Sequence, residues 1–283
     1  MMRIERAGRN SMKRLATAGV LLAAMGGVAV AGTGVPSEWQ MNMQGQVTEL
    51  GRGVRSFHDL LLWIITGICL LVGVLLAIVI VRFREDKNPV PARTTHNTLL
   101  EVAWTVAPVA ILVAIAIPSF RLLREQLVIP QADVVVKTTG YSWYWGYEYP
   151  ADQGGFKFDS NMVPESDLQP GQLRLLAVDN EMVVPVNKVV KVQVTSADVL
   201  HSFAVPAFAI KVDAVPGRLN ETWFKADREG IYYGQCSELC GNGHPYMPIA
   251  VRVVSEQQYS AWLAEAKQKY AAVPAPTRVA NAQ

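Results

Sequence analysis

The most prominent pattern along this chain of 283 residues is a pair of long, uncharged, apolar runs in its first half. Leu60 to Val81 spans 22 residues and Val102 to Phe120 spans 19. A helix of about 20 residues rises about 30 Å, which matches the hydrocarbon core of a bilayer. The second run contains Pro108 and Pro118, which a membrane helix tolerates when neighbouring helices satisfy the freed carbonyl groups. The pattern predicts a two-helix transmembrane hairpin over residues 57–122.

Beyond the second run the hydrophobic period shortens, and residues 128–254 alternate in short segments rich in β-forming residues. Gly, Pro, Asn and Asp separate these segments at the spacing of a β-sandwich. The expected strands are Asp133 to Thr139, Ser142 to Tyr149, Gln172 to Val178, Lys188 to Thr195, Leu219 to Ala226, Ile231 to Gly234 and Pro248 to Val254. In the second of these, alternation would place Trp143 and Trp145 on one face unless a bulge intervenes.

The two ends of the chain differ in kind. Five basic residues precede an apolar stretch that ends in Ala29-Val30-Ala31, which predicts a secretory signal peptide over residues 1–31, with a third membrane helix as the alternative. Residues 32–56 then lead to the hairpin. After the sandwich, Ser255 and Gln258 form a capping box that opens a helix over 255–270. The Ala- and Pro-rich residues 271–283 are expected to form a disordered tail.

Charge orients the hairpin. Arg82, Arg84, Lys87 and Arg93 lie in the short loop between the two runs, and the positive-inside rule places that loop in the cytoplasm. The β domain then lies outside, where a cleaved signal peptide also delivers it. The net charge of +2 and the lack of a basic stripe interleaved with aromatic residues exclude a nucleic-acid binder.

The candidate chemistry lies between Cys236 and Met247. This segment offers two thiols, the imidazole of His244 and a thioether within twelve residues, and its glycines and proline favour a loop that can curl around a metal. Thiolate, imidazole and thioether ligands together favour copper. The third cysteine, Cys69, lies within the first apolar run and is expected to be a small apolar residue there.

A second imidazole must come from elsewhere in the chain. His58 and His96 lie at the ends of the hairpin, which leaves His201 at the start of a β-like segment. A single blue-copper atom needs only one thiolate, so two thiolates four residues apart could bridge two copper atoms. The weaker ligands would be Met247 and the backbone carbonyl of Glu238. A disulfide and a zinc site with two cysteines and two histidines are the competing interpretations.

On these features the chain resembles cytochrome c oxidase subunit II, whose binuclear copper centre is called CuA. The resemblance covers roughly residues 57–270 and is carried by three stretches: 95–105 (THNTLLEVAWT), 143–149 (WYWGYEY) and 236–247 (CSELCGNGHPYM). It implies a cupredoxin-like Greek-key β-sandwich with a C-terminal helix, anchored by two helices in a bacterial inner membrane, with the copper domain on the periplasmic side.

The resemblance also implies roles for individual residues. The copper ligands would be His201, Cys236, the Glu238 carbonyl, Cys240, His244 and Met247. The Glu238 side chain would bind a magnesium ion shared with the catalytic subunit. Trp143 would admit electrons from cytochrome c. The acidic residues that dock this partner would be Glu148, Asp159, Asp179 and Asp198. Glu101 would stand at the entrance of a proton path into the catalytic subunit.

The implied function is electron entry into a proton-pumping terminal oxidase, in which this chain passes electrons from cytochrome c to the haem- and copper-containing subunit I, with subunit III as a further partner. Two rival functions remain. A quinol oxidase subunit shares the hairpin and sandwich but lacks the copper ligands, whereas a periplasmic copper chaperone or metallosensor would only bind metal. The chain contains no Cys-x-x-Cys-His haem-attachment motif, so no fused cytochrome c domain is expected.

Overall fold

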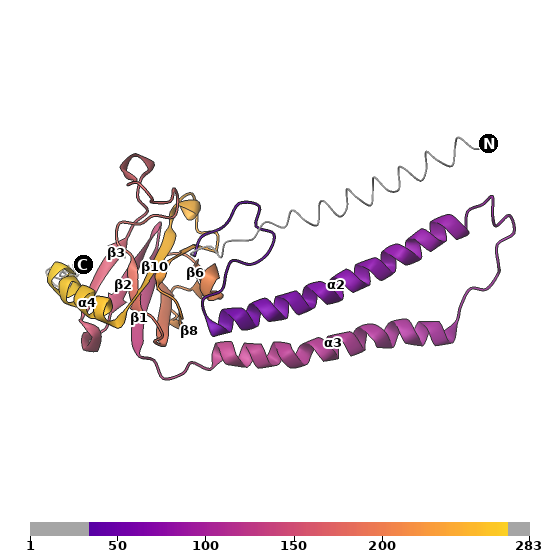
Figure 1. The fold of residues 1–283 in the computed structure, drawn as a ribbon, viewed down its shortest axis with the longest axis horizontal. Coiled ribbons are helices and arrows are strands. Elements are labelled where there is room, and N and C mark those ends of the chain that lie inside the picture. Colours follow the sequence, from indigo (N-terminus) through magenta and orange to yellow (C-terminus); the bar gives the residue numbers. More distant parts are fainter. Residues whose placement is uncertain (1–33, 271–283) are drawn as a thin grey trace, which may run out of the picture.

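The computed structural model describes residues 34–270, which form a long helical hairpin attached to a β-sandwich (Figure 1). The predicted signal peptide, residues 1–31, and the predicted tail, residues 271–283, lie outside the described residues. In Figure 1 the hairpin projects from one side of the β domain, and the C-terminal helix lies on the opposite side of that domain.

The hairpin consists of α2 (Glu49–Arg82) and α3 (Thr98–Leu127), and each contains one of the two apolar runs. Both helices begin at a side-chain cap. Thr48 Oγ1 accepts a hydrogen bond from the Gly51 N–H at 2.8 Å, and Asn97 Oδ1 accepts one from the Leu100 N–H at 3.1 Å. The most apolar stretches of both helices have no buried residues within the chain. A surface this apolar requires lipid or another protein around it.

Within residues 34–270, the sandwich is built from ten strands in three sheets. One sheet has the order β3-β2-β1-β5-β8, a second has the order β4-β10-β9, and β6 pairs with β7 alone. The strands are β1 (Val134–Tyr141), β2 (Tyr144–Tyr149), β3 (Phe156–Ser160), β4 (Met182–Pro185), β5 (Val190–Ser196), β6 (His201–Val205), β7 (Ile210–Ala214), β8 (Asn220–Phe224), β9 (Gly230–Gln235) and β10 (Pro248–Val254). The pairs β1–β5 and β4–β10 are parallel, and the other pairs are antiparallel.

Alternation along the strands explains why the five-stranded sheet has one solvent-exposed face and one buried face. In β1 and β5 every second residue is buried, whereas β6 is buried along its whole length. The buried face packs against the second sheet and the β6–β7 pair through a core that includes Trp145, Phe203, Phe208 and Phe224. The predicted sandwich is confirmed, and it buries the strand that begins with His201.

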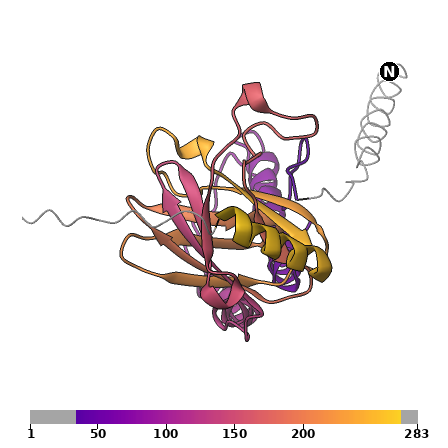
Figure 2. The ribbon, with the colours of Figure 1, turned by 90° about the vertical axis from the view of Figure 1, so that its left-hand side faces the viewer.

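The C-terminal helix α4 (Glu256–Tyr270) begins as the capping box predicted. The Ser255 N–H donates to Gln258 Oε1 at 3.2 Å, and the Gln258 N–H donates to Ser255 Oγ at 3.3 Å. Figure 2 shows α4 lying across the strands. The Trp262 ring packs at a tilted angle against Tyr149 and edge-on against Phe156. This aromatic packing closes one end of the sandwich.

The prediction of a strand over Gln172–Val178 is wrong. That segment follows Pro170 and Gly171 and curls into turns, in which the Ala177 N–H donates to the Leu173 carbonyl at 2.9 Å. Leu175 has a φ of 65°, a left-handed conformation that interrupts an extended strand. Strand β6 was indicated only as a β-like segment beginning at His201, and three further strands, β3, β4 and β7, were not predicted. Each has only four or five residues, which gives a weak periodic signal.

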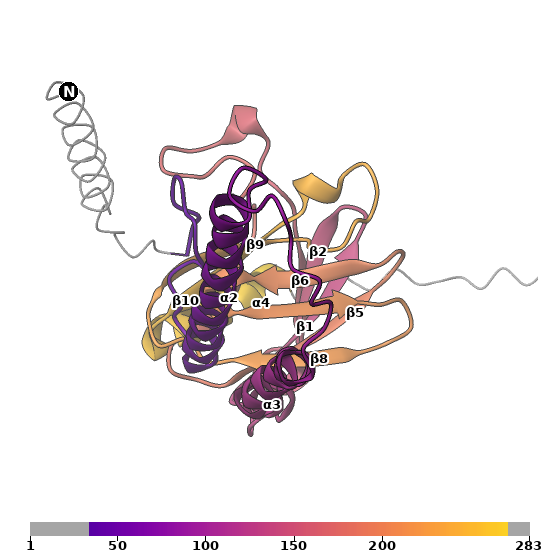
Figure 3. The same ribbon diagram turned by 90° about the vertical axis from the view of Figure 1, so that its right-hand side faces the viewer.

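The hairpin and the sandwich are joined at the start of α2 and at the end of α3. Thr48 Oγ1 donates to the Phe208 carbonyl at 3.0 Å, and the Val47 N–H donates to the Ala207 carbonyl at 3.1 Å. Figure 3, which views the hairpin nearly along its helices, shows α3 beside β8, and these two elements are in contact. The hairpin therefore holds the β domain through two separate attachments.

Candidate metal centre

The predicted ligands come from two elements that the sandwich holds side by side. His201 begins β6 and is completely buried. Cys236 follows β9 directly, and the two strands contact each other. The Ser237 N–H donates to the Ser202 carbonyl at 3.0 Å, so the residues after His201 and after Cys236 are bonded to each other. This backbone bond brings the loop to the isolated histidine.

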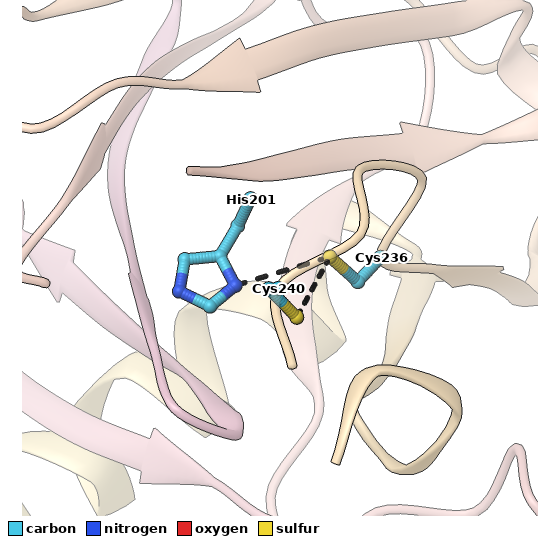
Figure 4. A group of neighbouring side chains, drawn as sticks. All are labelled: His201, Cys236 and Cys240. Atoms are coloured by element: carbon cyan, nitrogen blue, oxygen red, sulfur yellow. Dashed lines mark hydrogen bonds between the residues drawn. The ribbon is translucent and has the colours of Figure 1, made fainter. Parts of the chain in front are cut away.

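His201, Cys236 and Cys240 form a compact buried cluster (Figure 4). Their ligand atoms all lie within 4.8 Å of one another. Cys236 Sγ lies 3.9 Å from His201 Nδ1 and 3.9 Å from Cys240 Sγ. The sulfur–sulfur distance is almost twice that of a disulfide bond, and both cysteines are free thiols.

The remaining three predicted ligands complete the same cluster. Cys240 Sγ lies 3.5 Å from His244 Nδ1 and 3.5 Å from Met247 Sδ. The Glu238 carbonyl oxygen lies 3.3 Å from Cys236 Sγ. Each thiol thus has one imidazole nitrogen beside it, and each has one weaker donor beside it. The sequence predicted these six donors, with one imidazole and one weaker ligand for each of two metal ions, and the fold brings all six residues together.

The environment of the thiols is apolar. Both cysteines and Met247 are buried, and His244 is half-buried. Burial raises the pKa of the Cys240 thiol to about 12, and the neighbouring Cys236 adds to this effect. Two adjacent thiols in a dry pocket are costly to ionise unless a cation compensates their charge. A donor set of two soft sulfurs, two imidazoles, a thioether and a carbonyl fits copper in preference to a hard cation.

Asp198, which was predicted to dock a partner, also touches the cluster. Its Oδ1 lies 2.8 Å from His201 Nε2, on the side of the ring opposite the nitrogen that faces Cys236. Its Oδ2 accepts a hydrogen bond from the Ser142 N–H at 2.7 Å. Burial opposes ionisation, but the hydrogen bonds from His201, Val199 and Ser142 outweigh it and hold the pKa of Asp198 at about 2. No pattern in the sequence indicated this contact beyond a spacing of three residues.

Trp143 lies on the outer side of the cysteine loop. Its Nε1–H donates to the Cys240 carbonyl at 3.0 Å, and its side chain is 39% exposed. A Cβ atom added to Gly243 would overlap the indole ring, so this glycine allows the close contact. Strand β2 begins only at Tyr144, which leaves Trp143 in the preceding turn. Alternation therefore does not apply to it, and Trp145 alone enters the core.

The other acidic residues predicted to dock cytochrome c lie on the solvent-exposed face of the five-stranded sheet or beside it. Asp159 on β3 and Asp179 are close enough that Asp179 contributes to the raised pKa of Asp159, although burial is the larger cause. Glu148 on β2 forms an ion pair with Lys137 at 3.1 Å. All three residues are exposed. Asp159 lies near both stacked rings of Tyr141 and Tyr144, and Glu148 lies near Tyr141.

Glu101 lies at the far end of the hairpin, in the first turn of α3. Its Oε1 accepts a hydrogen bond from the Asn97 N–H at 3.3 Å, which supports the helix start in the manner of a capping residue. The fold therefore separates Glu101 from the cysteine cluster by the length of the hairpin (Figure 1).

Comparison with known proteins decides the family. The periplasmic-domain model of cytochrome c oxidase subunit II matches residues 134–254, and the transmembrane-domain model of the same subunit matches residues 36–122. A probable cytochrome c oxidase subunit 2 from Rickettsia bellii is 50% identical over 237 residues, which cover 84% of this chain and 87% of that protein. This chain belongs to the cytochrome c oxidase subunit II family.

A second relative agrees with this assignment. Cytochrome c oxidase subunit 2 of Cereibacter sphaeroides is 49% identical over 250 residues, covering 83% of this chain and 82% of that protein. The crystal structure of the periplasmic domain of subunit II from Bradyrhizobium japonicum is 60% identical, covers 50% of this chain and 99% of that structure, and has a TM-score of 0.47.

The chain is thus a subunit of cytochrome c oxidase, a haem–copper terminal oxidase. It crosses the inner membrane twice, through α2 and α3, and carries a periplasmic β domain. The family carries CuA copper, and the clustered histidine and cysteines have the chemistry that such a centre requires.

Proposed function

We propose that this subunit accepts electrons from cytochrome c and passes them to the haem- and copper-containing catalytic subunit of the oxidase. The observation that carries the proposal is the convergence of two thiols, two imidazoles, a thioether and a carbonyl in one buried cluster. We further propose that His201, Cys236, Glu238, Cys240, His244 and Met247 hold two copper ions. When bound, the copper pair supplies a carrier for one electron.

Hydrogen bonds within the β domain hold the cysteine loop in place. The cysteine loop is pinned by backbone bonds at both ends, because the Ser237 N–H donates to Ser202 and the Cys236 N–H donates to the Met247 carbonyl at 3.4 Å. The Trp145 Nε1–H donates to the same carbonyl at 3.3 Å. Rigid ligands reduce the rearrangement that accompanies a change of charge. This fixed loop would favour rapid one-electron transfer.

Electron entry is proposed at Trp143. The indole is partly exposed and is hydrogen-bonded to the backbone of Cys240, so it forms a direct connection from solvent to a metal ligand. Asp159 and Asp179 beside this area give an acidic surface that would attract a basic cytochrome c. Glu148 would contribute less charge, because Lys137 is paired with it. Asp198 would combine docking with support for His201.

Three finer roles remain proposals from the family resemblance. The half-buried Glu238 side chain would bind magnesium together with the catalytic subunit, Glu101 would admit protons at the inner end of α3, and subunits I and III would cover parts of the exposed hairpin. The hydrogen bond between Glu101 and the Asn97 N–H is a competing, purely structural use of that carboxylate.

Metal analysis of the purified full-length chain tests the proposal. We expect two copper ions per chain and an electron paramagnetic resonance spectrum of one unpaired electron shared between both nuclei. A Cys240→Ser variant should lose the shared signal, because only one thiolate would remain. One copper, a zinc ion, or a Cys236–Cys240 disulfide that excludes metal would each reject the binuclear centre.

A further inference from the structure

A second feature of the molecule, independent of the copper cluster, is an open hollow where the hairpin meets the β domain. It has a volume of about 550 Å³. Its lining comes from the start of α2, the end of α3 and strand β8, which lie together in Figure 3. The lining residues are Glu49, Leu50, Arg121, Arg124, Glu125, Val128 and Trp223.

On α3, the hollow begins directly beyond the outer end of the apolar run. The uncharged run of α3 ends at Phe120, and Arg121 and Arg124 follow within four residues. At 1.5 Å per residue, both lie within about 6 Å of the end of the run. The headgroup layer of one leaflet has a similar thickness, because the two layers together account for the difference between a bilayer of about 40–45 Å and its hydrocarbon core of about 30 Å. Long arginine side chains extend readily into this layer.

The hollow contains equal numbers of positively and negatively charged side chains, and these can bind a ligand. Arg121 and Arg124 offer two guanidinium groups, and Glu49 and Glu125 offer two carboxylates. None of the four forms an ion pair or a side-chain hydrogen bond with another residue in the range 34–270. The rest of the lining is mainly apolar, with a buried Leu50 and the ring of Trp223.

We propose that this hollow binds a phospholipid whose zwitterionic headgroup carries a primary amine, as in phosphatidylethanolamine. The two arginines would hold the phosphodiester through charge-assisted hydrogen bonds. The two carboxylates would accept hydrogen bonds from the ammonium group, and the apolar wall would contact the glycerol and the upper acyl chain. Tryptophan is favoured at this membrane depth, where one side of the ring is apolar and the other is polar.

The mixture of charges selects this headgroup over others. A purely anionic headgroup, such as phosphatidylglycerol, would satisfy the arginines but would leave both carboxylates facing further negative charge. A choline headgroup carries no N–H donors for the carboxylates. A free phosphate ion would lack the apolar contacts that the wall offers. The hollow is therefore complementary to phosphate and primary ammonium together.

The test uses the assembled oxidase, exchanged into equal parts of phosphatidylethanolamine, phosphatidylglycerol and phosphatidylcholine and examined by native mass spectrometry. The oxidase should retain one phosphatidylethanolamine molecule that the double variant Arg121→Gln and Arg124→Gln retains about tenfold less, since two charge-assisted bonds are lost. The double variant Glu49→Gln and Glu125→Gln should keep a bound phospholipid but lose the preference for the amine headgroup.

Matched controls are the double variants Arg174→Gln with Arg218→Gln and Glu229→Gln with Glu265→Gln, which change exposed residues outside the hollow and should retain the lipid. Equal retention by the arginine variant and the wild type would overturn the proposal, as would a wild-type preference for phosphatidylglycerol or phosphatidylcholine. Unchanged haem and copper content would show that each variant has assembled.

A second measurement needs no variant. A photoreactive phosphatidylethanolamine should label residues 121–128 or Trp223 in the unmodified oxidase, and excess unlabelled phosphatidylethanolamine should suppress the labelling. Excess inorganic phosphate should not suppress it, which separates a lipid from a free-phosphate site. Labelling that avoids both segments, or that phosphate alone abolishes, would reject the lipid site. Neither measurement depends on the copper proposal.

Discussion

Asp198 and His201 are joined by a hydrogen bond of 2.8 Å between Oδ1 and Nε2, while the other ring nitrogen of His201 faces Cys236. The second carboxylate oxygen holds the Ser142 N–H at 2.7 Å, and Ser142 directly precedes Trp143. One exposed carboxylate thus orients a buried proposed ligand and also holds the turn that carries the proposed entry residue. A carboxylate in this position fixes the imidazole tautomer and the ring orientation for a metal.

Asp198→Asn should weaken metal binding while leaving the fold intact. The amide keeps the size of the side chain but loses the charge that supports the His201 ring, and loss of such a partner typically costs about 10–100-fold in metal affinity. Copper retention during titration with a chelator measures the effect. Asp159→Asn removes another exposed carboxylate that has no contact with a proposed ligand, so its copper affinity should match the wild type. Equal affinities for both variants would contradict the role of Asp198.

Gly140→Ala should disturb the same histidine through a steric contact with its ring. A Cβ atom at this position would lie 2.8 Å from His201 Cδ2, and the His201 side chain is completely buried. Overpacking of this kind costs about 1–3 kcal/mol of folding stability. Thermal unfolding and copper content should both fall. Thr139→Ala, on the neighbouring outward-facing position, should change neither, and a normal copper content in Gly140→Ala would show that the ring is free to shift.

Trp143→Phe should slow electron entry severalfold. The smaller ring loses the Nε1–H that donates to the Cys240 carbonyl, although it still fits over Gly243. Stopped-flow reduction of the oxidase by cytochrome c measures the rate, and copper content should stay unchanged. Tyr144→Phe, which alters the adjacent aromatic residue without touching the cysteine loop, serves as the control. An unchanged rate for Trp143→Phe would remove this residue from the entry route.

Asp159→Asn should lower the oxidation rate of cytochrome c at sub-saturating concentrations and low salt. Exposed charges of this kind act mainly on the association rate, and screening shortens their reach to about 8 Å at 0.15 M ionic strength. The difference from the wild type should therefore shrink as salt is added. Glu148→Gln should have the smaller effect, because Lys137 already compensates its charge. A larger effect of Glu148→Gln would place the docking surface elsewhere.

The helices and the strand-rich domain could be predicted because their signals are local. The uncharged runs define α2 and α3 by length, and Ser255 with Gln258 defines the start of α4, since each pattern follows from one element's own periodicity or cap. The strand predicted at Gln172–Val178 failed for the same reason. Its alternation resembled a strand, but the preceding Pro170 and Gly171 and the left-handed Leu175 form turns that a periodic count cannot see.

The sequence by itself determined the donor types of the candidate centre, because thiols, imidazoles and a thioether are properties of the residues. It also indicated His201 as the missing imidazole, since the other histidines lie at the hairpin. Only the tertiary structure decided that Asp198 supports that ring, that Trp143 lies over Gly243, and that a hollow of mixed charge forms where α2, α3 and β8 meet. These features join residues that are close in space through the packing of separate elements, and no local pattern in the chain records such contacts.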